Sequence, residues 1–475
     1  MLIGREREKS ELLRLVEREE SQFCVVYGRR RVGKTYLIRE SFNYRFTFQY
    51  TGIANATNKQ QLKSFRDALQ TAGMGKQRLP KDWFEAFHLL SDFLDSLPKN
   101  EKKVVFIDEL AWMDAPRSRM VSALESFWNG WVMAYMPRNV IFIVCASASS
   151  WITKNIFNNR GGLHNRATAR IYVRPFTLNE CEQYVRAQQL SMTRRDIIDA
   201  YMIFGGIPYY WNYLRREYSL AQNIDNIFFT EQAVLKNEYN ELYRSLYNNP
   251  QMHMTIVETL GKKKVGMTRE EIVQFTGIEN SGDLTKVLME LEQCDFIRSY
   301  YSFGKNKYGM LYQLMDNYTL FYFQFIESNV HHNTHYWSEM LNSRLHSTWA
   351  GLSFERVCLQ HTDQIKKALG IWGVSTSVGA WHVRANEEHE GAQVDLLIDR
   401  GDNVINLCEM KYYDGEYVIT KEEDMRLRNR AGLFQRLTKT RKAIRLTMIT
   451  SFGLSHNMYW SCVHNELTAD CLFEK

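Results

Sequence analysis

The chain has 475 residues, of which 45% are hydrophobic and 24% charged, and its formal net charge is +6. This composition is typical of folded globular proteins and argues against a disordered or fibrous chain, and the length predicts about three domains. A net charge of this size does not by itself indicate a polyanionic partner.

The N-terminal residues MLIGREREKSELL contain no apolar stretch of the kind found in a signal peptide. Elsewhere, no apolar run reaches the roughly 18 residues that cross a bilayer. We therefore expect a cytoplasmic protein without a membrane partner. The eight cysteines are far apart and form no C-x-x-C pair, which favours buried free thiols over a zinc or redox site.

The first predicted element is a short apolar strand at residues 23–27, which leads into the loop GRRRVGKT and then into a helical segment. A strand, a glycine-containing loop and a helix are the context in which a P-loop binds phosphates. The glycines let backbone N–H groups surround the anion, while Lys34 reaches the β- and γ-phosphates and Thr35 offers its hydroxyl to Mg²⁺. The sequence therefore predicts an ATP site built by Gly28, Arg29, Arg30, Arg31, Val32, Gly33, Lys34, Thr35 and Tyr36.

A second apolar strand, residues 104–107, ends in Asp108 and Glu109. Asp108 is expected to hold Mg²⁺ together with Thr35, and Glu109 to orient the attacking water. A strand that ends in two acids is common in α/β proteins, and the P-loop upstream is what makes this pair indicative of an ATPase.

A third apolar strand, residues 140–145, is followed by ASASS. Because ligands of parallel sheets gather at the carboxyl ends of strands, Ser147 is a candidate contact for the γ-phosphate, although an ordinary serine-rich turn explains the same residues. Arg160, Arg166 and Arg170 come next. Arg166 is the first candidate for an arginine finger, and a plain surface arginine is the alternative for each of the three.

The segments IGREREKSELL, GRRRVGKT, VVFIDEL, CASASSW, RPFTLNE and FGGIPYYW together resemble the archaeal-type ATPases, a branch of the STAND and AAA-like P-loop NTPases, over residues 1–330. The resemblance implies an ATP- and Mg²⁺-dependent ATPase core at 1–175 and a helical lid at 176–245. It also implies that Gly4, Arg5 and Glu6 lie near the nucleotide base and that residues 205–208 belong to the lid. A simple turn between helices is the alternative for this GGIP sequence.

The middle of the chain, residues 252–300, is predicted to form three short helices, followed by two strands around residues 304–306. Thr268 and Glu271 have the spacing of a capping box, and Ser281 is expected to cap the third helix. Residues 246–330 resemble a winged helix-turn-helix, whose third helix would enter a DNA major groove. That helix is mostly acidic, which favours a packing or protein-docking role over DNA reading. The charged residues are Asp283, Lys286, Glu290, Glu292 and Asp295.

Three groups in this region carry weaker predictions. Lys305 and Lys307, in the predicted wing, are candidates for contact with a nucleic-acid backbone. The aromatic segment 316–326 has helical spacing and is expected in the core. The histidines that follow are expected in a polar linker rather than a metal site, and they are His331, His332 and His335.

The C-terminal part begins with a predicted helix from about Trp349, followed by strands at 393–398 and 404–410. Residues two apart in a strand share a face, so Glu409 and Lys411 point the same way, and a hairpin would place Asp395 opposite them. Two carboxylates that hold Mg²⁺, with a lysine that positions water, suit metal-assisted phosphodiester hydrolysis. Glu355, on the preceding helix, would complete the oxygen shell.

This D…ExK pattern resembles the PD-(D/E)xK nuclease superfamily over residues 345–475, with Val394 where proline would precede the aspartate. The alternative is a structural salt bridge between Glu409 and Lys411. Residues 421–445 are rich in lysine and arginine, which suits a phosphate backbone or a solvated face. Gln435 is a further polar candidate on that segment.

We therefore predict an α/β protein: a P-loop NTPase parallel sheet with a helical lid, a winged helix-turn-helix and a restriction-endonuclease-like α/β domain. The expected function is ATP hydrolysis that controls a nuclease-like module acting on DNA. A nucleotide-dependent scaffold whose C-terminal domain does not cut and a DNA-binding regulator are the alternatives. The expected partners are ATP, DNA, a second copy of the chain and a protein bound through the winged helix.

Overall fold

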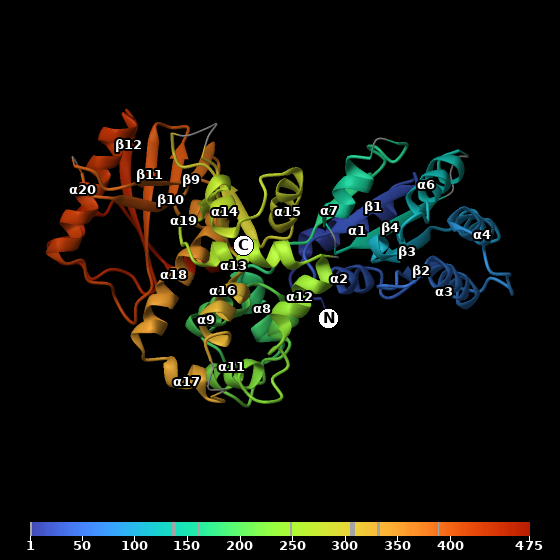
Figure 1. Cartoon of the computed structure of the whole chain (residues 1–475), viewed down its shortest axis with the longest axis horizontal. Coiled ribbons are helices and arrows are strands. Elements are labelled where there is room, and N and C mark those ends of the chain that lie inside the picture. Colours follow the sequence, from blue (N-terminus) through green and yellow to red (C-terminus); the bar gives the residue numbers. More distant parts are fainter. Residues whose placement is uncertain are drawn as a thin grey trace. The chain divides into compact units, whose positions relative to one another are not determined.

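The computed structural model describes residues 2–134, 139–147, 149–159, 161–247, 249–304, 309–329, 333–387 and 389–475. The chain forms two compact units, Met1–Pro175 and Phe176–Lys475 (Figure 1). Within the described ranges, no helix combines the length and apolar character needed to span a bilayer. All eight cysteines are buried and free, as expected from their spacing.

The first unit is built on a five-stranded parallel sheet with the strand order β2-β3-β4-β1-β5. The strands are β1 (Gln22–Tyr27), β2 (Phe48–Thr51), β3 (Lys103–Asp108), β4 (Val140–Ala146) and β5 (Ala169–Tyr172). Every residue of β4 is buried, as a central strand covered on both faces requires. The helical elements are α1 (Glu6–Glu17), α2 (Lys34–Ser41), α3 (Asn58–Thr71), α4 (Trp83–Asp95), α5 (Leu110–Met113), α6 (Met120–Glu125), η1 (Ser126–Val132), α7 (Ser149–Ile152) and η2 (Thr153–Phe157).

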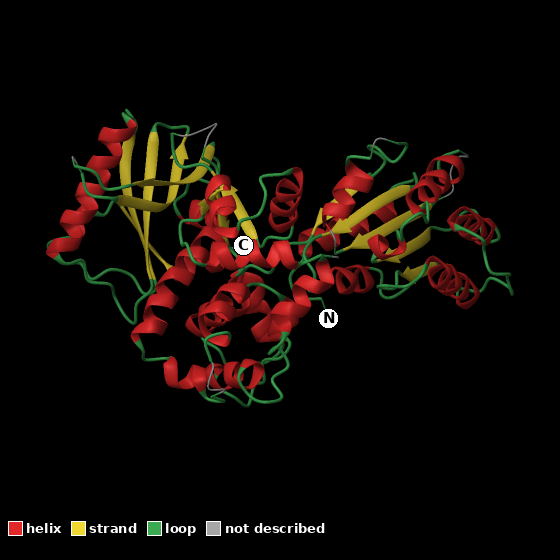
Figure 2. Cartoon of the chain, in the orientation of Figure 1, coloured by secondary structure: helices red, strands yellow, loops and turns green. Residues whose placement is uncertain are grey.

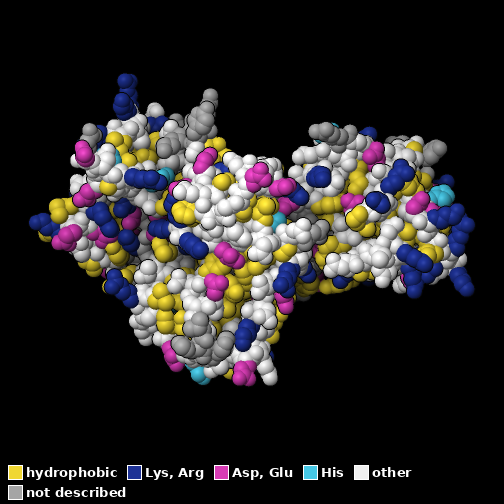
Figure 3. Space-filling view, in the orientation of Figure 1, with side chains coloured by type: hydrophobic (Ala, Val, Ile, Leu, Met, Phe, Trp, Pro, Cys, Tyr) yellow, Lys and Arg dark blue, Asp and Glu magenta, His cyan; other side chains and the backbone are white. Residues whose placement is uncertain are grey.

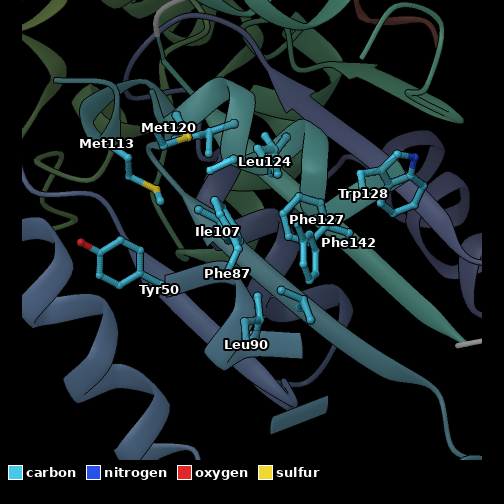
Figure 4. Packing of buried hydrophobic residues seen from close by; sticks show 14 of the residues in the cluster. Tyr50, Phe87, Leu90, Ile107, Met113, Met120, Leu124, Phe127, Trp128 and Phe142 are labelled. Carbon is cyan, nitrogen blue, oxygen red and sulfur yellow. The ribbon is translucent and has the colours of Figure 1, made fainter. Parts of the chain in front are cut away.

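The main core of this unit lies between one face of the sheet and the helices α3, α4, α6 and η1. Alternate strand residues such as Ile107 and Phe142 point into it, where they meet Phe87 and Leu90 of α4 and Phe127 of η1 (Figure 4). Parallel pairing places the carboxyl ends of β1, β3 and β4 at a common edge, where ligands of parallel sheets bind.

The second unit starts with a helical part, which is followed by a small antiparallel sheet of order β6-β8-β7 (Figure 2). The helices of the first part are α8 (Leu178–Ala187), α9 (Arg194–Phe204), α10 (Pro208–Trp211), α11 (Leu220–Phe228) and α12 (Glu238–Leu246). The middle segment contains α13 (Gln251–Gly261), β6 (Met267–Thr268), α14 (Arg269–Thr276), α15 (Gly282–Gln293), β7 (Ile297–Tyr300) and β8 (Leu311–Leu314). It is followed by α16 (Asn317–Phe321), η3 (Tyr322–Ile326) and α17 (Tyr336–Met340).

The C-terminal part of the second unit holds another five-stranded sheet, of order β13-β12-β11-β10-β9. The pairs β9/β10 and β10/β11 are antiparallel, and the pairs β11/β12 and β12/β13 are parallel. The elements are α18 (Arg344–Gln360), α19 (Thr362–Ala368), β9 (Thr376–Val383), β10 (Ala392–Arg400), β11 (Val404–Lys411), α20 (Lys421–Thr438), β12 (Ala443–Thr450), η4 (Trp460–Cys462), β13 (Asn465–Thr468) and η5 (Ala469–Phe473). The predicted α/β class is thus confirmed, and the C-terminal part contains a second five-stranded sheet.

Two tight contacts join the segments of the second unit. A Cβ on Gly206 would lie 1.9 Å from the carbonyl oxygen of Phe176, so the turn between α9 and α10 requires glycine there. His361, which is 1% exposed at the end of α18, accepts a hydrogen bond at Nε2 from the backbone N–H of Leu178 (2.9 Å). Its Nδ1 lies 2.8 Å from the carbonyl oxygen of Val357 and donates to it.

Several local predictions can be compared with these elements. The capping box of Thr268 with Glu271 is present at α14, whereas Ser281, the N-cap residue of α15, makes no side-chain cap bond. The predicted single helix after Trp349 is two helices, α18 and α19, because the chain turns at His361. Lys305, Lys307, His331 and His332 lie outside the described residues, and His335 is exposed.

Candidate active site

The phosphate-binding loop joins β1 to α2, as the sequence predicts. Gly28 has a φ of +140°, and a Cβ there would lie 2.4 Å from the carbonyl oxygen of Val173. Gly33 precedes α2 with a φ of +87°, and an added Cβ would meet nothing within 4 Å. Packing therefore requires glycine at position 28, whereas backbone conformation favours it at position 33.

Lys34 is buried, with 5% of its surface exposed, and its ammonium group lies inside the loop. The Nζ atom donates to the carbonyl oxygens of Gly28 (3.0 Å) and Arg29 (2.8 Å) and to Oγ of Ser147 (3.1 Å). All three acceptors are neutral, so a phosphate group would be a stronger, charge-assisted acceptor for the same donor.

Hydrogen bonds connect the ends of α2, β3 and β4 at this place. The hydroxyl of Thr35 donates to Oδ2 of Asp108 (2.8 Å). Glu109 accepts from Oγ (2.6 Å) and from the backbone N–H (3.2 Å) of Ser147. Because Ser147 also accepts from Lys34, the residues Lys34, Ser147 and Glu109 form one chain of hydrogen bonds. The backbone N–H of Glu109 donates to Oδ1 of Asp108 (3.0 Å) and so joins this chain to the Thr35–Asp108 pair.

The carboxyl group of Asp108 lies in a poorly solvated position, with 4% of the residue exposed. Burial raises the pKa of this carboxyl, the charge of Glu109 raises it further, and the hydrogen bond from Thr35 opposes both effects. A hydroxyl and a carboxylate are the hard oxygen donors that Mg²⁺ prefers, and a cation would favour the ionised form. Thr35 and Asp108 therefore fit the predicted magnesium.

The other residues assigned to the nucleotide surround this network. Arg5 is buried, and its guanidinium donates to the carbonyl oxygen of Val32 (3.2 Å), which brings the Gly4–Glu6 segment against the loop. The Arg30 guanidinium lies over the ring of Trp112 at 5.9 Å. Tyr36 is 43% exposed.

Of the candidate arginine fingers, Arg166 lies on the segment before β5 and Arg170 lies in β5. Arg166 is exposed, and its Nε donates to the carbonyl oxygen of Gly162 (3.3 Å). Arg170 is also exposed and lies over the ring of Phe157 at 4.3 Å. Arg160 lies outside the described residues. Arg166 therefore lies on the surface of the first unit. An arginine finger that acts on the nucleotide of a neighbouring molecule would have to lie on the surface as well.

A second polar cluster forms in the C-terminal part, around Glu355 on α18 and Asp395 on β10. Both carboxylates bind the ammonium of Lys264, from the loop between α13 and β6, at 2.6 Å for Oε2 of Glu355 and 3.3 Å for Oδ2 of Asp395. Gln393 also donates to Asp395. Burial raises the pKa of Glu355 to about 7, and the charge of Asp395 raises it while Lys264 opposes the shift.

Glu409, on β11, lies beside this pair. The antiparallel hairpin pairs Leu396 with Cys408, so the next position along each strand places Glu409 opposite Asp395, as predicted. Glu409 forms ion pairs with Lys411 (2.9 Å) and with Arg430 of α20. Burial raises the pKa of Glu409, but the charges of Lys411 and Arg430 outweigh it and hold this pKa below its ordinary value. Its negative charge contributes to the raised pKa of Glu355.

The predicted metal shell is therefore not assembled in this arrangement. Among the described residues, no three or more His, Cys, Asp or Glu side chains lie close enough to hold a metal ion. Asp395 and Glu409, which we expected to hold Mg²⁺, are engaged by Lys264 and by Lys411 and Arg430 instead. The donor atoms have the right chemistry, but their charges are already neutralised by protein cations.

The strand that carries Glu409 and Lys411 is also fixed to helix α9. Tyr412, the next residue, donates a hydrogen bond from its hydroxyl to Asp199. Arg195 lies over the Tyr412 ring at 3.6 Å and forms a 2.9 Å ion pair with Asp414. The helical part and the C-terminal sheet thus share a polar and aromatic contact one residue from the ExK triplet.

The basic stretch predicted at 421–445 forms α20 and the start of β12. Gln435 and Arg445 are exposed, whereas Lys442 binds Asp399 at 2.6 Å. On the face that Figure 3 shows, lysine and arginine side chains are interspersed with acidic ones rather than joined in one basic patch. These observations suit a solvated surface with local basic positions.

Comparison with known proteins bears on the first unit most directly. Residues 2–214 match the family described as an ATPase domain predominantly from Archaea. This part of the chain is similar to archaeal-type P-loop ATPase domains. The match covers the loop, the two acids and Ser147 described above, and it supports nucleotide binding by the ATPase domain.

Three further proteins are similar to this chain. An uncharacterized protein of Methanocaldococcus jannaschii is 22% identical over 429 residues, which cover 87% of this chain and 88% of that protein. The Walker-type ATPase of Pyrococcus abyssi has a similar fold, with a TM-score of 0.50, 17% identity, and coverage of 67% of this chain and 95% of that one. The ORC2 protein of Aeropyrum pernix, in ADPNP–ADP complexes, is more distant, with a TM-score of 0.42, 15% identity, and coverage of 67% and 91%.

Sequence reasoning missed the cations of the second cluster. Arg430 is 21 residues from Glu409, and its place on a helix next to the sheet gave a weak signal. Lys264 is 131 residues from Asp395 and belongs to a lysine-rich turn that looks like ordinary surface. Only the packing of the middle segment on the C-terminal part shows that it reaches the carboxylates.

Proposed function

We propose that this chain hydrolyses ATP and that its nucleotide state controls a C-terminal module that acts on DNA. The observation that carries the first half is the network in which Lys34, Thr35, Asp108, Glu109 and Ser147 meet at the ends of three elements. In a P-loop ATPase these positions hold the phosphates, the cation and the attacking water.

The residues of the ATPase domain have separable roles in this proposal. Lys34 leaves its carbonyl acceptors and binds the β- and γ-phosphates, because the charged acceptor is stronger. Thr35 and Asp108 hold Mg²⁺, which supplies charge neutralisation on the phosphates when bound. Glu109 accepts a hydrogen bond from the attacking water and orients it, and Ser147 keeps the Glu109 carboxylate in place.

The second half rests on the C-terminal cluster and on its link to α9. Glu355 and Asp395 share the ammonium of Lys264, and Glu409 pairs with Lys411 on the neighbouring strand. These are the residue types of a D…ExK nuclease site, although protein cations engage the carboxylates in this arrangement. The hydrogen bond of Tyr412 to Asp199 connects α9 of the helical part to the end of β11, which carries Glu409 and Lys411. A movement of the helical part on ATP binding would therefore change the cluster.

A test of this control compares the wild type with Lys34→Ala, and with Lys63→Ala as a control on an exposed lysine of the same domain. DNA affinity and plasmid cleavage are measured with and without ATP in the presence of Mg²⁺. We expect ATP to change both quantities in the wild type and in Lys63→Ala, and to change neither in Lys34→Ala. Equal ATP responses in all three proteins would reject the control.

A nucleotide-dependent scaffold is the second candidate, because each carboxylate of the cluster has a cationic partner. In this case the C-terminal part binds its target without cutting it. Cleavage by the wild type that requires Mg²⁺ or Mn²⁺ and is lost in Asp395→Ala supports the nuclease. Equal and negligible cleavage by both proteins supports the scaffold.

The role of the middle segment is part of the same proposal. Its α15 exposes Asp283, Glu292 and Met289, a mixture that suits a protein partner better than a phosphate backbone. A DNA-binding regulator would require sequence-specific binding that survives physiological salt. Binding of the full chain to labelled duplexes across a salt series distinguishes the two.

A further inference from the structure

Lys264 is placed unlike an ordinary surface lysine. It belongs to the loop between α13 and β6, and its Nζ lies between a carboxylate of α18 and a carboxylate of β10, at 2.6 and 3.3 Å. Its side chain is 32% exposed, whereas those of Glu355 and Asp395 are 18% and 22% exposed. One ammonium thus bridges two carboxyl groups in a partly desolvated place, where the repulsion between two ionised carboxylates is large.

The middle segment that carries Lys264 is docked on the C-terminal sheet by other contacts. Ser302 forms an isolated β-bridge with Ala380 of β9, and the backbone N–H of Phe303 donates to the Ala380 carbonyl (2.8 Å). The Phe303 ring packs against Phe434 of α20, with ring centroids 5.2 Å apart. Lys264 therefore reaches the carboxylates from a segment held in place by backbone and aromatic contacts.

A second cation of the middle segment acts on the same carboxylate. Burial lowers the pKa of Arg298, on β7, and the charges of Tyr300 and Asp395 oppose that shift. The charge of Arg298 thus acts on Asp395 in addition to that of Lys264. A divalent cation that approached Glu355 and Asp395 would meet the Lys264 ammonium already bound to their oxygens, and the charge of Arg298 would also disfavour it.

We infer that Lys264 is an internal cation that occupies the Glu355–Asp395 pair and keeps divalent metal from it until the middle segment or the lysine side chain moves. This rests on the proposed function, in which these carboxylates serve a metal-dependent reaction. Mg²⁺ or Mn²⁺ can bind these carboxylate oxygens only if it displaces the ammonium of Lys264, and the contacts that hold the middle segment oppose that displacement. In this arrangement the Glu355–Asp395 pair is therefore blocked to metal, and release of Lys264 is the step that regulation would act on.

The test measures Mn²⁺ binding to the full chain without nucleotide, by electron paramagnetic resonance of free Mn²⁺. The variants are Lys264→Gln, Lys264→Met, which keeps the apolar stem, and Lys263→Gln as a matched control at the neighbouring lysine, which pairs with Glu271. Each is compared with its Asp395→Asn double variant, so that only binding at this cluster is counted. Circular dichroism identifies folded variants.

We expect either Lys264 variant to bind Mn²⁺ at the Asp395-dependent site at least about tenfold more tightly than the wild type, and Lys263→Gln to match the wild type. Equal Asp395-dependent affinity in the wild type and in both Lys264 variants would overturn the inference and leave the metal-dependent function standing. Absence of Asp395-dependent binding in every protein would reject the function together with the inference.

Discussion

Protonation of His361 is expected to weaken the junction between α8 and α18. Its Nε2 accepts a hydrogen bond from the backbone N–H of Leu178, so a proton added at Nε2 would remove the acceptor and bring two donors together. Burial lowers the pKa of His361 from 6.5 to about 4, while its hydrogen bond with Val357 opposes the shift. The stabilisation is therefore complete above pH 6.5 and is lost as the pH falls toward 4.

The difference between the two pKa values sets the size of the effect. At pH 5 the imidazole is protonated in the unfolded chain and neutral in the folded chain. This difference lowers the free energy of unfolding by about 2 kcal/mol at pH 5 and by ~3 kcal/mol below pH 4. Urea titrations at pH 7.5 and 5.0, followed by pulsed hydrogen exchange of the α8 and α18 peptides, measure it.

His361→Gln removes the titrating group, and His335→Gln is the control on an exposed histidine of the same unit. The glutamine variant at 361 should be less stable at pH 7.5 but should lose about 2 kcal/mol less than the wild type between the two pH values. The His335 variant should follow the wild type. Parallel losses in all three proteins would refute the argument from burial.

Three other outcomes follow from local geometry. Gly28→Ala should reduce binding of a fluorescent ATP analogue at least about tenfold, because its Cβ would lie 2.4 Å from the Val173 carbonyl, whereas Gly33→Ala should cost only ~1 kcal/mol of stability; similar affinities would show that packing at position 28 does not matter. Glu109→Gln should lower phosphate release by about 100-fold or more and leave analogue binding within about threefold, and unchanged turnover would remove Glu109 from the reaction. Thr268→Ala should lower the unfolding free energy by ~1 kcal/mol through loss of the capping box at α14, and an unchanged urea midpoint would contradict that role.

The fold of the first unit and the place of its candidate site were predictable because the residues that decide them lie close together in the sequence. The glycines, the lysine and the two acids occur at strand ends that short apolar runs already mark, and parallel pairing brings those ends together. The network around Ser147 needed only one further assumption, that residues 140–145 form a strand of the same sheet. Hence fold class and the place of the site followed from patterns within a few residues.

The C-terminal cluster was predictable only in part. The hairpin of β10 and β11 followed from alternation and a turn, so the neighbourhood of Asp395 and Glu409 was expected. The partners of those carboxylates depend on long-range packing, which one sequence does not encode in its periodicity. Lys264 and Arg430 changed the electrostatics from that of a metal shell to that of an ion-paired cluster.

The clamp on Tyr412 has a mechanical consequence. A residue held by a hydrogen bond to Asp199 and by the stacked guanidinium of Arg195 cannot slide along its neighbouring strands without breaking both contacts. Any displacement of α9 would therefore have to carry the end of β11 with it or break both contacts. The same two contacts thus tie the position of Glu409, three residues before Tyr412, to the position of α9.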